Sequence, residues 1–201
     1  MQAFLRGISY IFHPLFIPIG GTICYFLVTP RLDSLQLQSG NILPIFILTI
    51  IIPIMLFFIL KNIGLISSIF APKLGERKYP LYFSIVIYLM ILYKVIPLNY
   101  INELYYFFVG LLIATSATLL LLFTKIKASI HLSGMGTILV YLIGLSIRFE
   151  VNITFAIALF TLMTGLVATS RLFMNAHSRI EVFIGFLIGG ASQLLVLKYW
   201  L

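Results

Sequence analysis

Two arginines, a histidine and a carboxylate lie close together in a chain that otherwise carries few such groups. The stretch from Ser170 to Glu181 reads SRLFMNAHSRIE and lies between two apolar runs, where one membrane helix would end and the next begin. His177 and Glu181 are four residues apart, so they would share a helix face. Arginines bind phosphate oxygens with paired hydrogen bonds, and a histidine whose tautomer a carboxylate fixes can attack phosphorus. The pattern therefore indicates phosphoryl transfer.

The composition excludes a soluble domain. Of the 201 residues, 62% are hydrophobic and only 9% are charged, whereas a soluble domain carries about 25% charged residues. The apolar residues come in long runs that approach the roughly 20 residues needed to cross a bilayer as a helix. We therefore expect an all-α fold, a polytopic transmembrane helical bundle.

The apolar residues form seven runs, of which two are short enough to lie at the membrane surface instead. We expect six to seven spans, at about residues 8–28, 42–60, 81–98, 104–124, 128–147, 153–169 and 180–200. Residues 1–60 would form an N-terminal transmembrane hairpin, and residues 61–201 the transmembrane core that carries the site. Both would belong to one integral membrane unit.

Counting the spans places three polar segments at one membrane surface. Two spans separate Arg77 from His131, and two more separate His131 from Arg171. The residues expected to gather there are Lys73, Arg77, Ser129, His131, Ser170, Arg171, His177 and Glu181. One histidine can attack phosphorus while the other protonates the leaving oxygen. Because several cationic side chains beside two histidines and a single carboxylate make a poor site for a divalent cation, we expect neither a metal nor another cofactor.

At these residues the sequence resembles the type 2 phosphatidic acid phosphatase superfamily, membrane lipid phosphatases related to the vanadium haloperoxidases. The third motif of that family is Ser-Arg, five residues, His, three residues and Asp. The chain has the same spacing from Ser170 and Arg171 through His177 to Glu181, with Glu in place of Asp.

The other two motifs of the family match less closely. The second, Pro-Ser-Gly-His, aligns with residues 128–131, where Ser129 and His131 are retained. The first is Lys, six residues, Arg-Pro. Here Arg77 lies three residues before Pro80, and Lys73 lies four residues before Arg77. The resemblance covers the chain from about Phe70 to the C-terminus, and its implied fold is the helical core of these phosphatases.

The resemblance implies a role for each matching residue. His177 would be the nucleophile that forms a phosphohistidine, Glu181 would orient it, and His131 would be the general acid on the leaving group. The residues that would bind the phosphate are Arg171, Arg77, Lys73, Ser129 and Ser170.

The expected activity is that of a metal-independent lipid phosphatase in the cytoplasmic (inner) membrane of a bacterium. Its substrate would be a lipid phosphate or diphosphate: polyprenyl diphosphate, phosphatidate, phosphatidylglycerol phosphate or a lipid A phosphate. The alternative is a non-catalytic member of the same family that binds lipid phosphate, or that serves as a subunit or transporter. The altered first motif and the Glu at position 181 keep this alternative open.

Each residue also has a structural interpretation. Arg171 and Arg179 would be juxtamembrane charges, and His177 with Glu181 an ordinary pair at a helix start. Lys125 and Lys127 are expected to set orientation without a chemical role. His13, which precedes Pro14, is interpreted as an interfacial histidine at a helix kink.

The remaining features exclude several other classes. The net charge of +8 is scattered between apolar runs, so we expect contact with membrane lipid and no nucleic-acid binding. Cys24 is the single cysteine, which leaves no disulfide framework. We expect no cleaved signal peptide. The oligomeric state stays open.

The side of the membrane that the site faces also stays open. The basic residues lie mostly at the site's surface, which points it toward the cytoplasm, whereas bacterial members of the resembled family often act on the periplasmic side.

Overall fold

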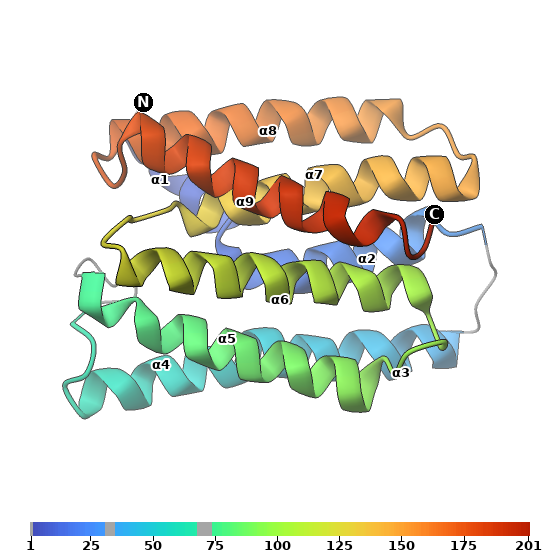
Figure 1. Cartoon of the computed structure of the whole chain (residues 1–201), viewed down its shortest axis with the longest axis horizontal. Coiled ribbons are helices and arrows are strands. Elements are labelled where there is room, and N and C mark those ends of the chain that lie inside the picture. Colours follow the sequence, from blue (N-terminus) through green and yellow to red (C-terminus); the bar gives the residue numbers. More distant parts are fainter. Residues whose placement is uncertain (1, 31–34, 68–73) are drawn as a thin grey trace.

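The structure, a computed structural model, describes residues 2–30, 35–67 and 74–201. Within these ranges the chain is helical, without strands, and the long helices run side by side along one axis (Figure 1). The elements are α1 (Gln2–Ile11), the 3-10 turn η1 (Pro14–Phe16), α2 (Ile17–Val28), α3 (Leu35–Phe46), the π-helical turn η2 (Ile47–Ile51), α4 (Ile52–Asn62), the 3-10 turn η3 (Leu74–Glu76), α5 (Lys78–Met90), the π-helical turn η4 (Ile91–Val95), α6 (Asn102–Phe123), α7 (Ile130–Phe149), α8 (Thr154–Phe173) and α9 (Arg179–Leu197).

Among the described residues, seven helical segments are long and apolar enough to cross a membrane. They are Ala3–Val28, Gln38–Asn62, Lys78–Val95, Asn102–Phe123, Ile130–Phe149, Thr154–Phe173 and Arg179–Leu197. This confirms the all-α, multi-pass fold and the larger of the two predicted span counts. The first span begins at Ala3, earlier than predicted, because α1 continues the apolar segment on the N-terminal side of the break at Pro14.

Helix α7 lies at the centre of the bundle. In the most apolar 18-residue window of α7, 67% of the residues are buried, against 17% in that of α8, where Phe155, Leu159 and Leu162 are exposed. The core around α7 is aromatic, since Phe107 of α6 packs on Tyr141 with the ring centroids 4.4 Å apart. At the end of the bundle that carries the C-terminus, Arg148 pairs with the buried Glu103 at 3.2 Å.

Helix α9 crosses α7 in close backbone contact (Figure 1). A Cβ atom at Gly185 would overlap the carbonyl oxygen of Ser129, and one at Gly189 would overlap that of Ser133. The absence of a side chain at these two glycines therefore lets the backbones of α7 and α9 approach closely. The Ser129 N–H also donates to the Glu181 carbonyl at 3.0 Å, which joins the start of α7 to the first turn of α9.

Candidate functional site

A cavity of about 210 Å³ opens between the helices near the end of the bundle where the α6–α7 and α8–α9 loops lie, the left end in Figure 1. Its wall comes from residues far apart in the sequence. The histidines and arginines that line it are His13, Arg77, His131, Arg171 and His177.

The four predicted residues in this wall lie at helix ends or in the segments that join them. Arg77 immediately precedes α5, His131 lies in the first turn of α7, Arg171 lies in the last turn of α8, and His177 follows in the α8–α9 loop. All four are 5–7% exposed. The structure thus brings together residues that the span count had placed at one surface.

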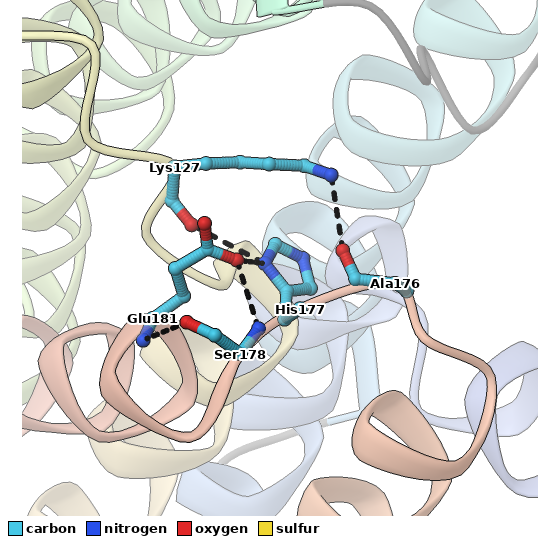
Figure 2. Close-up of polar contacts among 5 residues, drawn as sticks. All are labelled: Lys127, Ala176, His177, Ser178 and Glu181. Atoms are coloured by element: carbon cyan, nitrogen blue, oxygen red, sulfur yellow. Dashed lines mark hydrogen bonds and ion pairs between the residues drawn. The ribbon is translucent and has the colours of Figure 1, made fainter.

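His177 is held by two acceptors on the same ring nitrogen. Its Nδ1 lies 3.0 Å from Oε2 of Glu181 and 3.2 Å from the carbonyl oxygen of Lys127 (Figure 2). A carboxylate and a carbonyl can only accept, so Nδ1 carries the ring proton. A neutral imidazole then keeps a lone pair on Nε2, the atom that a nucleophile needs. Figure 2 shows that this second nitrogen points away from Glu181.

The Glu181 carboxylate is itself fixed by the start of α9. Its Oε2 accepts from the Ser178 N–H at 3.1 Å, and the Ser178 hydroxyl accepts from the Glu181 N–H at 3.3 Å (Figure 2). This reciprocal pair is a capping box, which satisfies two N–H groups that a helix start would leave open. The same carboxylate therefore caps α9 and orients His177.

The charges around the cavity favour an anion. Burial, with Arg77 and Arg171 nearby, lowers the pKa of His177 to about 4 against the opposing hydrogen bond from Glu181. Burial, together with the Arg171 charge, also lowers the pKa of Arg77 to about 10. Lys127, in the loop before α7, has a lowered pKa because of burial and the Arg77 charge. Cations near one another in a low-dielectric cleft attract an anionic group.

Arg171 is tied to the first helix. Its Nη1 donates to Oγ of Ser9 at 3.5 Å, and Ser9 Oγ lies 2.7 Å from Oγ of Ser170. Ser170 in turn donates to the Leu5 carbonyl at 2.6 Å. Ser170 therefore faces α1 and does not line the cavity, and its predicted contact with phosphate stays a prediction.

Several buried polar atoms at this end have no hydrogen-bond partner among the described residues. They are Oγ of Ser129, Nε2 of His131 and Nε of Arg171. Buried polar atoms are nearly always paired, so each such exception calls for an explanation. All three belong to residues that the sequence singled out, although Ser129 is not among the residues that line the cavity.

His13 and Lys127 contact the site, although the sequence alone indicates only a structural role for each. His13 does lie at the predicted kink, where it caps η1, but it also lines the cavity. Lys127, interpreted as an orientation charge, donates to the Ala176 carbonyl at 3.0 Å and holds His177 through its own carbonyl (Figure 2). Lys73, the remaining predicted phosphate ligand, lies outside the described residues.

Away from the ionisable groups the cavity is mostly apolar. Its walls there come from α4 and α5 together with α2 and α6, and include Pro53, Leu56, Phe57, Leu81, Phe83 and Ile87. The N-terminal segment, predicted as a hairpin beside the core, thus contributes to the cavity wall. The cavity joins a cationic end to a hydrocarbon-lined chamber.

No family model matches the chain, and neither a curated protein nor a solved structure matches it.

Proposed function

We propose that the protein is a metal-independent lipid phosphatase of the bacterial cytoplasmic membrane, a divergent member of the type 2 phosphatidic acid phosphatase superfamily. One observation carries this proposal: a neutral His177, with its lone pair on Nε2, shares a cavity with Arg77, Arg171 and His131. A nucleophile, two phosphate-binding cations and a second imidazole are the parts that phosphoryl transfer through a histidine requires.

The reaction has two steps. Nε2 of His177 attacks phosphorus while Arg77 and Arg171 neutralise the phosphoryl oxygens. The bond from phosphorus to the leaving oxygen breaks, its electron pair stays on that oxygen, and His131 supplies the proton. Water then attacks phosphorus and gives a proton back to His131. The bond from phosphorus to Nε2 of His177 breaks, its electron pair returns to Nε2, and inorganic phosphate is released. Glu181 keeps the His177 proton on Nδ1 throughout.

The shape of the cavity supports a lipid as the substrate. Its apolar chamber between α4 and α5 would hold the start of a hydrocarbon chain, with the phosphate at the cationic end. Candidates are polyprenyl diphosphate, phosphatidate, phosphatidylglycerol phosphate and a lipid A phosphate. The substrate would enter sideways from the bilayer.

The test is release of phosphate from this panel of lipids in detergent, with chelator present, by the wild type and by His177→Ala. The proposal predicts release from at least one lipid that requires His177 and is unaffected by chelator. Vanadate, which mimics the pentacoordinate state, should inhibit it.

The alternative predicts a different result. A protein that binds lipid phosphate without turnover would retain lipid binding and release no phosphate from any member of the panel. That outcome would overturn the phosphatase assignment.

A further inference from the structure

His13 lines the cavity although it belongs to none of the three motifs. It precedes Pro14 at the break between α1 and α2, and its ring lines the cavity. The ring meets that of His131 edge to face, with centroids 5.3 Å apart and the planes 83° apart. A residue of the first helix therefore lies beside the residue expected to act on the leaving group.

The tautomer of His13 follows from its backbone contact. The Leu15 N–H donates to Nδ1 at 3.2 Å, so Nδ1 is an acceptor and carries no proton. The ring is then neutral with its proton on Nε2. Within the part of the chain that the structure describes, this N–H has no hydrogen-bond acceptor, although the ring borders the cavity.

This makes His13 complementary to His177. On His177, Nδ1 is protonated and Nε2 has the lone pair. On His13 the protonation is reversed, so one imidazole can attack while the other can donate. We propose that His13 donates from Nε2 to a phosphoryl oxygen of the bound lipid phosphate, next to His131. The inference rests on the proposed function and adds a phosphate contact from the first helix.

The competing explanation is that His13 only caps η1 through Nδ1. Two substitutions separate these roles. In His13→Asn the amide oxygen lies near the position of Nδ1 and can still cap, since Asn is a strong cap residue, but nothing replaces Nε2. In His13→Gln the amide nitrogen reaches the position of Nε2 and can still donate, whereas the short-range cap is lost.

The experiment compares wild type, His13→Asn and His13→Gln for kcat/KM on the lipid panel and for inhibition by vanadate. We expect His13→Asn to lose kcat/KM and vanadate affinity by on the order of 10- to 100-fold, the range for a lost hydrogen bond to a charged group. His13→Gln should stay within a few-fold of wild type. Equal behaviour of all three proteins, or retention by Asn and loss by Gln, would overturn the inference.

A measurement on the wild type covers the case in which a variant does not fold. The chain has three histidines, so a ¹⁵N-histidine spectrum is simple. Vanadate should shift the Nε2–H resonance of His13. An unchanged His13 resonance would contradict the inference. If no lipid is hydrolysed, the proposed function fails. The effect of vanadate on the His13 resonance still tests whether His13 contacts a bound phosphoryl group.

Discussion

Nδ1 of His177 lies 3.0 Å from the carboxylate of Glu181, four residues later in the chain. The same carboxylate oxygen closes the capping box of α9 with Ser178. The orientation of the expected nucleophile is therefore set by the start of a helix that is packed, backbone to backbone, on α7. One side chain performs two functions, and mutagenesis can separate them.

Glu181→Gln should preserve the cap and impair the chemistry. A glutamine can complete a capping box. Its neutral amide, however, removes the negative charge that would stabilise the positive charge developing on His177, and leaves only the Lys127 carbonyl to hold the proton on Nδ1. We expect kcat to fall on the order of 10²- to 10⁴-fold, with little change in thermal stability. Phosphate release and thermal unfolding in detergent measure the two effects.

Ser178→Ala is the matched control for that variant. It removes the other half of the capping box and leaves the bond from His177 to Glu181 in place, so it should cost about 1 kcal/mol of stability and retain most activity. A larger loss of activity in Ser178→Ala than in Glu181→Gln would mean that the cap, and not the orientation of His177, is what matters.

Gly185→Ala should separate α9 from α7. Its new Cβ would overlap the Ser129 carbonyl oxygen, and backbone atoms on both sides cannot move without shifting a helix. We expect a loss of about 1–3 kcal/mol in stability and a larger relative loss of activity, since His131 would move away from His177.

Gly165→Ala is the control for this steric argument. Gly165 is exposed on α8, and among the described residues no heavy atom beyond its chain neighbours and its own helix backbone lies within 4 Å of the position its Cβ would occupy. Alanine is a better helix former than glycine, so this variant should match or exceed the wild type in stability and keep its activity. A Gly185→Ala protein as active as Gly165→Ala would show that the contact between α7 and α9 does not position the site.

The ionisation of His177 gives a prediction in pH. Burial and the neighbouring arginines lower its pKa to about 4, below the ordinary value of about 6.5. Between these values the unfolded chain binds more protons at this residue than the folded chain, so the free energy of unfolding should fall as the pH falls through this window. A histidine NMR titration in micelles, assigned with His177→Asn, should show the midpoint near 4. A midpoint at or above 6.5 would mean that the ring is not held neutral by its surroundings.

The bundle and the meeting point of its polar residues could both be predicted from the sequence, for physical reasons. Run length sets the spans, because a bilayer requires a minimum apolar length. Because two spans separate each of these residues from the next, Arg77, His131 and Arg171 end at one membrane surface whatever the packing. The remaining features depend on which face each helix turns inward. Ser170 turns toward Leu5 and Ser9, and no local pattern indicates that choice.

His13 illustrates the same limit. A histidine before a proline near the start of the first span is typical of a kink, and its ring does cap the turn that follows. Its contact with His131 arises because α2 packs against α7, a tertiary relationship between residues more than a hundred positions apart. The one local signal was an ionisable group in an apolar segment, which is uncommon without a role.

The central claim, that His177 carries the phosphoryl group, is tested most directly by trapping that intermediate. Protein incubated briefly with ³²P-labelled lipid phosphates and chelator, then quenched in alkali, should retain label on a histidine of the wild type. His177→Asn should retain none, whereas Arg179→Gln, which changes an exposed neighbour, should be labelled like the wild type. Lipid hydrolysis without label on His177, or equal label in His177→Asn, would contradict the account.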